Sequence, residues 1–130
     1  MLSFERPDER VAKDPPREHR IEMEIIVDCY DEVECASGWH AYLEDHLAFP
    51  FTARCDRERS VSPLRVGETV LVTEMADIDD CMSEMFVQVE LEVREFGVPL
   101  AQLVGVDVDA QTDQAIQDWH YWDQRGYQIG

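Results

Sequence analysis

Hydrophobic side chains recur every three or four positions between residues 31 and 47, a spacing that places them on one face of a helix. The stripe consists of Val33, Ala36, Trp39 or His40, Leu43 and Leu47. Asp31 is expected to be the N-cap, with Glu34 completing a capping box at the positive end of the helix dipole. The segment Phe49-Pro50-Phe51 should stop the helix. The sequence therefore predicts a helix from about residue 31 to residue 47.

Two further segments are read as helical. Residues 21–30 carry Ile25 and Ile26 next to acidic side chains, and although their spacing does not decide between helix and strand, we favour a short helix. A last helix is expected from about Thr112 to a stop at Gly126. Its Ile116 and Trp119 should pack on the rest of the molecule.

The period changes to two in the middle of the chain, which is typical of half-buried antiparallel strands. The alternating positions are Phe51, Ala53 and Cys55, then Val70 and Val72, then Phe86, Val87, Val89, Leu91 and Val93. Residues 96–100 add a turn and a short edge strand, where Pro99 is tolerated because its missing N–H faces solvent. The predicted class is α+β: a small antiparallel SH3-like barrel or sheet flanked by N-terminal and C-terminal helices.

The chain has 130 residues and a net charge of −18, with 45% hydrophobic residues. That length suits one domain, and that hydrophobic fraction can still form a core. Residues 1–19 mix acids, bases and prolines, so we expect a flexible charged tail followed by a single domain over residues 20–130. The negative charge excludes binding to nucleic acids and to anionic membranes, although it could also reflect a salty host.

The same sequence bears on compartment and on cysteine chemistry. No stretch reaches the roughly 20 apolar residues of a membrane helix, and the first residues are charged, so a cytoplasmic protein is expected. The four cysteines form no C-x2-C pair, which argues against a zinc site and favours buried free thiols.

The segment from Asp107 to Asp118 is the sharpest candidate site. Oxygen side chains stand at positions 1, 3, 5, 7 and 12 of this window, the offsets of an EF-hand calcium loop: Asp107, Asp109, Gln111, Asp113 and Asp118. Thr112 replaces the glycine that the loop needs, so we do not expect a true EF-hand. An acidic loop that holds a hard cation stays open, as does the alternative that Asp109, Thr112 or Asp113 only caps the following helix.

A second candidate is the pair Glu44 and Asp45 near the end of the first long helix. Two acids at a helix C-terminus oppose the helix dipole, and a cation would neutralise them. The alternative is that they form a solvated helix end.

Enzymatic readings find no support in the sequence. It contains no G-x-S-x-G, no glycine-rich phosphate loop and no H-E-x-x-H, and its four histidines are scattered. We therefore do not expect an enzyme, with a hydrolase using a divalent ion as Lewis acid only a weak rival.

Several blocks of the sequence occur in an order that is typical of a known family: residues 20–28, Gly38-Trp39, residues 42–45, residues 49–55, residues 62–64, Val66-Gly67, residues 84–86, residues 98–100 and residues 118–122. In these blocks the chain resembles the small calcium-binding proteins of the cyanobacterial CcbP type. The resemblance covers residues 20–130. It implies a cytoplasmic acidic protein that binds Ca²⁺ without EF-hands and buffers free calcium.

The resemblance also ranks the acids. Glu44, Asp45 and Asp118 lie inside matching blocks, and Glu84 and Asp28 lie in weaker ones. Asp107, Asp109 and Asp113 depend on spacing alone. Asp45 is the first choice because it combines a matching block with the helix-end argument.

A rival of another class is an SH3-like interaction module for a basic protein partner. In that reading the acidity reflects attraction, solubility or a high-salt host rather than calcium. Binding that ignores a calcium chelator would favour it.

Overall fold

The computed structural model describes residues 12–27 and 29–125. Within those residues the chain forms three α-helices, two 3-10 helices and five strands. In order they are α1 (Pro15–Glu24), α2 (Glu32–His46), β1 (Phe51–Cys55), β2 (Thr69–Met75), η2 (Ile78–Cys81), β3 (Phe86–Leu91), β4 (Arg94–Pro99), η3 (Leu100–Gln102), β5 (Leu103–Val106) and α3 (Ala110–Gln124).

The five strands form one antiparallel sheet in the order β4-β3-β2-β1-β5. Ala53 of β1 stands opposite Val70 of β2 on one side and Gly105 of β5 on the other. In the described part of the chain β4 and β5 do not pair with each other, so the sheet is open rather than closed into a barrel. The predicted α+β class is confirmed, in its sheet form.

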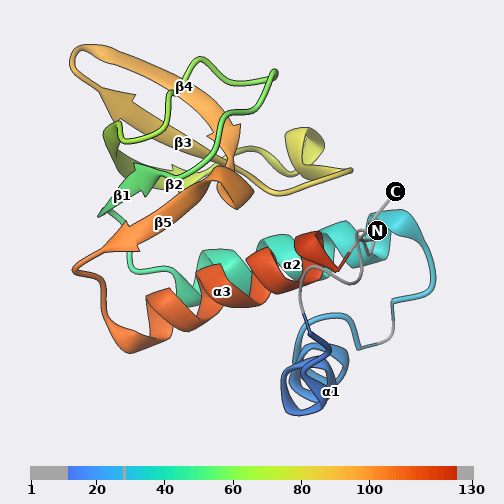
Figure 1. The fold of residues 1–130 in the computed structure, drawn as a ribbon. Helices are drawn as coiled ribbons and strands as arrows, with labels where there is room; N and C mark the ends of the chain where they lie inside the picture. The colour runs from blue at the N-terminus through green and yellow to red at the C-terminus, as the bar shows by residue number, and fades with distance from the viewer. Residues whose placement is uncertain (1–11, 28, 126–130) are drawn as a thin grey trace, which may run out of the picture.

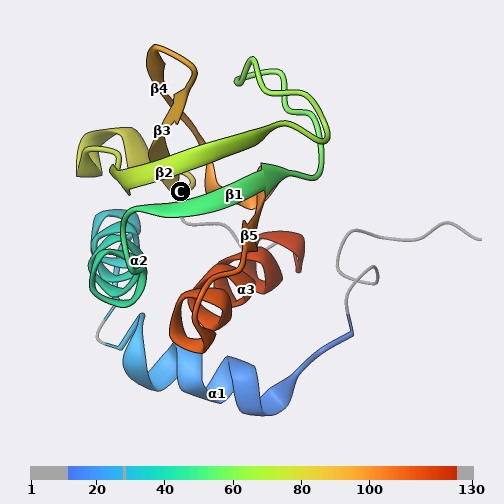
Figure 2. The same ribbon diagram turned by 90° about the vertical axis from the view of Figure 1, so that its left-hand side faces the viewer.

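The helices form two layers on one side of the sheet (Figures 1 and 2). α2 and α3 lie side by side against the sheet, and α1 crosses beneath them. α2 and α3 run in opposite directions. The end of α2 lies beside the start of α3, where the Ala48 N–H donates to Thr112 Oγ1 over 3.0 Å. Further along, the ring of Trp39 in the middle of α2 lies 5.8 Å from the ring of Trp122 near the end of α3.

The predicted first long helix is confirmed as α2. The Asp31 carboxylate accepts from the Glu34 N–H, and Glu34 reaches back to the Tyr30 N–H, one residue beyond the N-cap. Ala36, Trp39, Leu43 and Leu47 are buried as the stripe predicts. The prediction that Val33 is buried is wrong, because this residue lies in the first turn of α2 and faces solvent.

The alternating segments are confirmed as β1, β2 and β3, and the edge strand as β4. The prediction that Val93 belongs to a strand is wrong, since this residue is exposed in the turn between β3 and β4. β5 has only four residues and no alternation, so its sequence carries no strand period. At its Gly105, side chains of Val108 and Ile116 fill the space that a Cβ would need.

The N-terminal segment differs from the sequence expectation. A helix begins at Pro15, within the expected tail, and ends at Glu24 rather than continuing through residue 30. Pro15 and Pro16 occupy the first two helical positions, where a missing N–H costs nothing, and Asp14 caps them. The prolines therefore start a helix rather than prevent one. Residues 1–11 lie outside the described residues.

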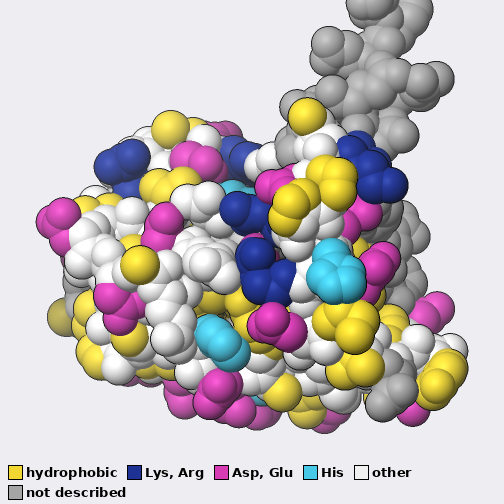
Figure 3. Space-filling view, turned by 90° about the horizontal axis from the view of Figure 1, so that it is seen from below, with side chains coloured by type: hydrophobic (Ala, Val, Ile, Leu, Met, Phe, Trp, Pro, Cys, Tyr) yellow, Lys and Arg dark blue, Asp and Glu magenta, His cyan; other side chains and the backbone are white. Residues whose placement is uncertain are grey.

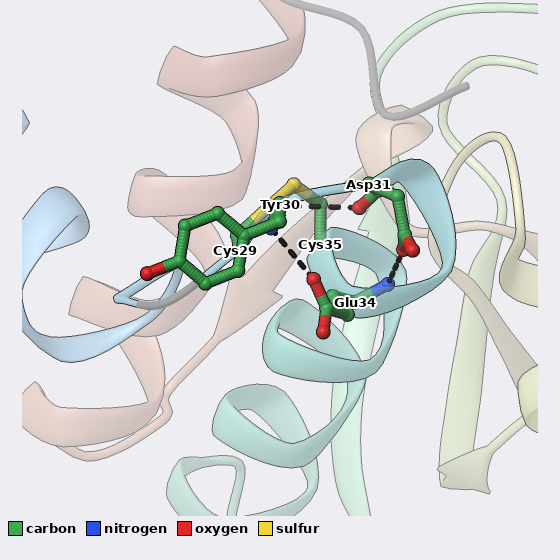
Figure 4. Close-up of a disulfide and its surroundings, with 5 residues drawn as sticks. All are labelled: Cys29, Tyr30, Asp31, Glu34 and Cys35. Atoms are coloured by element: carbon green, nitrogen blue, oxygen red, sulfur yellow. Dashed lines mark hydrogen bonds between the residues drawn. A yellow bond between two sulfur atoms is a disulfide. The ribbon is translucent and has the colours of Figure 1, made fainter.

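Two cysteines differ from the prediction and two agree with it. Cys29 and Cys35 form a disulfide with a Cα–Cα distance of 5.1 Å, because the α1–α2 connection folds back over the first turn of α2 (Figure 4). Cys55 and Cys81 are buried free thiols, as predicted, and burial raises the pKa of both.

The C-terminal helix is confirmed as α3, with Ile116 and Trp119 buried. Its expected stop, Gly126, lies outside the described residues. None of the helices in the described ranges has the length and apolar character needed to cross a membrane.

Candidate metal centre

Asp118, a predicted ligand, lies on α3 in a buried network of charges. Its side chain is 0% exposed, and its Oδ1 lies 2.6 Å from Arg20 Nη2 and 3.2 Å from Arg17 Nη1. Its Oδ2 accepts a hydrogen bond of 2.9 Å from the Tyr42 hydroxyl. Burial, and then the charge of Asp118, raise the pKa of Tyr42, so this phenol is a protonated donor. Protein donors thus occupy both oxygens of Asp118.

The same network joins α1 to the rest of the fold. Arg17 and Arg20 belong to α1, and Tyr121 of α3 adds a second tie by accepting from the Asp14 N–H and donating to Glu18. Opposite charges in a site shielded from water hold each other more strongly than at the surface. Through its ion pairs with Arg17 and Arg20, Asp118 therefore holds α1 against α3.

Glu84, another predicted ligand, pairs with an arginine. Both of its oxygens accept from Arg59, over 2.6 and 3.0 Å. Asp123, near the end of α3, stands close enough that Glu84 adds to the effect of burial in raising the Asp123 pKa. Arg59 supplies the positive charge beside Glu84 and Asp123, a contact that no local sequence pattern indicates.

Glu44 and Asp45 lie in the last turn of α2 and face solvent. The Asp45 side chain is 81% exposed, and its Oδ2 lies 3.6 Å from Nδ1 of His46. That Nδ1 also lies 2.9 Å from the Tyr42 carbonyl oxygen. The exposed positions of Glu44 and Asp45 match the alternative interpretation, a solvated helix end. Asp28 lies outside the described residues.

Asp107, Asp109 and Asp113 belong to the connection from β5 into α3. Asp109 is the N-cap of α3, and its Oδ1 accepts from the Thr112 N–H over 2.7 Å. Hydrogen bonds from the backbone and side chain of Thr112 lower the Asp109 pKa, so the carboxylate stays charged. Asp113 accepts from Gln117. The element before this loop is strand β5, whereas an EF-hand would have a helix there.

Asp107 is the one acid of this loop with an unusual backbone. Its φ of 56° lies in the left-handed region, which aspartate tolerates better than most residues. Its carboxylate is exposed and makes no hydrogen bond or ion pair within residues 12–27 and 29–125. A strained backbone that presents a free carboxylate is a feature often found at functional sites.

The two acids Asp107 and Asp109 line a hollow of about 440 Å³ between the β5–α3 connection and the end of α2. Thr52 and Thr112, which carry hydroxyl groups, also line it, as do Ala48 and Pro50. The residues that line the hollow thus carry carboxylate and hydroxyl oxygens, which are among the ligand types that Ca²⁺ takes in six- to eight-fold coordination.

The acidic side chains of the described residues nevertheless do not form a close cluster. Among the described residues, no three side chains of His, Cys, Asp or Glu gather closely enough to hold a metal ion. A calcium site made from those residues alone must be completed by hydroxyl, carbonyl and water oxygens. Calcium accepts such mixed oxygen shells, whereas Zn²⁺ sites usually contain His or Cys ligands and Mg²⁺ needs a stricter octahedron.

Sequence reasoning missed the hydroxyl donors of the hollow. Thr52 lies 55 residues before Asp107 along the chain, and only the pairing of β1 with β5, which sets Thr52 opposite Val106, brings the two segments together. Thr112 was considered as a helix cap, but its contact with the Ala48 N–H carries no local signal.

Comparisons with known proteins identify the family of the chain. A family model described as "Calcium binding", of the CcbP type, matches residues 19–123. The crystal structure of Anabaena CcbP has 42% sequence identity and a TM-score of 0.80, covering 90% of this chain and 96% of that one. A structure described as a calcium-binding protein in the calcium-binding form has 40% identity and a TM-score of 0.79, covering 88% and 94%. No curated protein sequence matches. The chain belongs to the CcbP family of calcium-binding proteins.

Proposed function

We propose that this protein is an acidic, non-EF-hand calcium binder that buffers or senses Ca²⁺ rather than catalysing a reaction. Family membership supports calcium as the ion, and both similar structures are described by that property or family. A net charge of −18 favours the approach of cations. The cytoplasm stays our prediction for the compartment. The rival interaction module, in place of calcium binding, is not favoured by the family.

We propose the hollow at the β5–α3 connection as the principal calcium site. The observation that carries this proposal is that Asp107 and Asp109 line one hollow together with Thr52 and Thr112. Asp107 is free of protein partners in the described ranges, and Asp109 uses Oδ1 for the cap. Because hydrogen bonds hold the Asp109 pKa low, that carboxylate is ready to meet a cation at neutral pH.

The other predicted ligands fit an ion less well. Asp118 and Glu84 already have arginine partners, and exchanging an arginine for calcium would leave the guanidinium without its charge partner. Asp45 is exposed, and its Oδ2 lies 3.6 Å from Nδ1 of His46. Neither Asp45 nor Glu44 lines the hollow with Asp107 and Asp109, so these two acids become secondary, weaker candidates.

In this proposal the residues of the hollow have different roles in binding the ion. Asp107 and Asp109 would supply the charge, Thr52 and backbone oxygens of the wall would complete the shell, and Thr112 would keep Asp109 oriented and ionised. Bound Ca²⁺ would bridge the end of α2 and β1 to the start of α3. Two connections that now meet through the Ala48–Thr112 hydrogen bond would then be held by the ion as well.

Isothermal titration with Ca²⁺ at low ionic strength tests the site. Asp107→Asn and Asp109→Asn each remove a charge, yet asparagine keeps the left-handed backbone at 107 and the helix cap at 109. We expect each to weaken binding about tenfold or more, with Thr52→Val weakening it less. Asp45→Asn, which removes the same charge from an exposed position, is the matched control and should change affinity less than about twofold.

The results separate the proposal's two levels. A loss of affinity in Asp45→Asn with parental binding in Asp107→Asn would move the site to the end of α2. Parental binding in all four variants would place calcium elsewhere. If the unchanged protein takes up no Ca²⁺ at millimolar concentration and its melting temperature does not rise, calcium binding itself is refuted. With a real site, 100 Kd of free ion should stabilise the fold by about 2.7 kcal/mol.

A further inference from the structure

Four large hydrophobic side chains are exposed within a short stretch around the α1–α2 connection. Met23 is 59% exposed, Val27 53%, Tyr30 82% and Val33 59%. They make up half of the exposed large hydrophobic residues in the described part of the chain. We call these four residues the connection patch. It lies away from the calcium hollow, which is at the opposite end of α2.

Several exposed acids flank the connection patch in the sequence. No lysine or arginine occurs between Arg20 and Arg54 in the sequence. The exposed acids of this stretch that flank the patch are Glu22, Glu24, Asp31, Glu32 and Glu34. Arg20, at the near end, is held by Asp118. The face seen from below also shows hydrophobic and acidic side chains together along its right-hand side, with the basic ones nearer the middle and upper part (Figure 3).

Several contacts hold the described backbone on both sides of the patch. The Cys29–Cys35 disulfide closes the connection onto α2, and the carboxylates of Asp31 and Glu34 tie it to the helix start (Figure 4). Gly38 of α2 approaches the Ile25 carbonyl so closely that a Cβ there would collide with it. A surface that is already ordered loses little conformational entropy when a partner binds.

We propose that the connection patch docks a basic amphipathic helix from a partner protein. Apolar side chains of that helix would cover Tyr30 and Val33, with Met23 and Val27 beside them, and its flanking lysines or arginines would meet the surrounding acids. Recognition of this kind uses apolar anchors at helical spacing and charge complementarity at the rim. A second copy of this chain would bring acids against acids, and an anionic membrane would be repelled for the same reason.

The probe is a fluorescein-labelled 18-residue peptide of leucine and lysine with leucines at helical spacing. A peptide of the same composition, scrambled so that the stripe is lost, is its control. Fluorescence anisotropy is measured with the full chain and with Tyr30→Ser/Val33→Ser. The matched variant is Val66→Ser/Val93→Ser, which removes two exposed apolar side chains elsewhere. Circular dichroism and thermal melting check that each variant is folded.

A second pair of variants tests the charges. Glu24→Gln/Glu32→Gln removes two acids beside the patch, and Glu92→Gln/Glu95→Gln removes two exposed acids from the β3–β4 hairpin, so both variants have the same net charge. We expect Tyr30→Ser/Val33→Ser and Glu24→Gln/Glu32→Gln each to weaken binding of the striped peptide about tenfold, and both controls less than about twofold.

Three results would overturn the proposal. Equal weakening by the patch variants and their controls would reduce the binding to general attraction by a very acidic protein. Equal binding of the scrambled peptide would show that no helical stripe is recognised. A dimer in sedimentation that Tyr30→Ser/Val33→Ser dissociates would assign the patch to a second copy. Calcium binding is tested separately, so failure here leaves the proposed function standing.

Discussion

At the scale of single residues, the same carboxylate group has different roles because its neighbours differ. Asp118 is enclosed by two arginines and a tyrosine hydroxyl, whereas Asp107 projects from a left-handed backbone beside a hollow. Enclosure fixes Asp118 as a structural anion, since its charge is already balanced. Exposure and an open hollow leave Asp107 available for an ion.

Replacing Asp118 tests this division. Asp118→Asn should lower the free energy of unfolding by about 3 kcal/mol, because Arg17 and Arg20 lose the charge that balances them in a buried network. Calcium affinity should change less than about twofold. Urea denaturation and calcium titration measure the two effects, with Asp79→Asn as the exposed control. An unchanged stability together with a large loss of calcium affinity would make Asp118 a ligand.

His120 predicts a pH dependence of stability. Burial lowers its pKa below the ordinary value, and its Nε2 lies 2.7 Å from the Leu103 carbonyl oxygen. The unfolded chain therefore binds a proton at a higher pH than the folded chain does. Stability should fall as the pH drops from about 6.5 towards the lower folded pKa.

His120→Gln, which keeps a donor for Leu103, removes that titration. Urea denaturation between about pH 7.5 and 5.5 should show a steeper loss in the parent protein than in the variant. Parallel pH profiles would show that His120 does not contribute.

At the scale of elements, the connection between α1 and α2 depends on a covalent link. The disulfide joins residues six positions apart and encloses the N-cap Asp31. A loop of this length closed by a disulfide contributes about 2 kcal/mol in the chain-entropy description. The link supports the start of α2.

Reduction of the disulfide should therefore lower the free energy of unfolding by about 2 kcal/mol. Cys29→Ser/Cys35→Ser should reproduce the loss, and adding a dithiol reductant to this variant should change nothing further, because Cys55 and Cys81 are already free thiols. Chemical denaturation with and without the reductant is the measurement. Equal stability of the oxidised and reduced parent would contradict the role given to the link.

At the scale of the whole molecule, a net charge of −18 on 130 residues acts against compactness. Self-repulsion between carboxylates rises when salt is removed, since screening then reaches further. Ion pairs such as Arg59 with Glu84 relieve it locally, but most acids on the helices and hairpins are exposed.

The melting temperature should accordingly rise when KCl increases from about 0.02 M to about 0.5 M without calcium. At matched ionic strength Ca²⁺ should raise it further than Mg²⁺ does, because a flexible oxygen site suits calcium better. Differential scanning calorimetry gives both comparisons. A melting temperature that does not respond to salt would show that the acids do not repel one another appreciably.

The sequence determined those elements whose signals are local. The period of three to four and the Asp31–Glu34 cap predict α2, and alternation predicts β1 to β3, because side-chain burial on one face repeats with the backbone. The acidic charge and the family blocks likewise pointed to calcium from the sequence. The prolines of α1 led to the wrong prediction of a tail without regular structure. Proline starts a helix when it lies in the first turn and breaks one when it lies further along.

Tertiary structure alone decided which acids are available. Arg17 and Arg20 meet Asp118 across about a hundred positions of sequence, and Thr52 meets the Asp107 loop only through the pairing of β1 with β5. The strand β5 itself, short and interrupted by Gly105, is formed by its partner rather than by its own pattern. Contacts between segments distant in sequence leave no periodic signal in either segment, and the state of a carboxylate depends on such contacts.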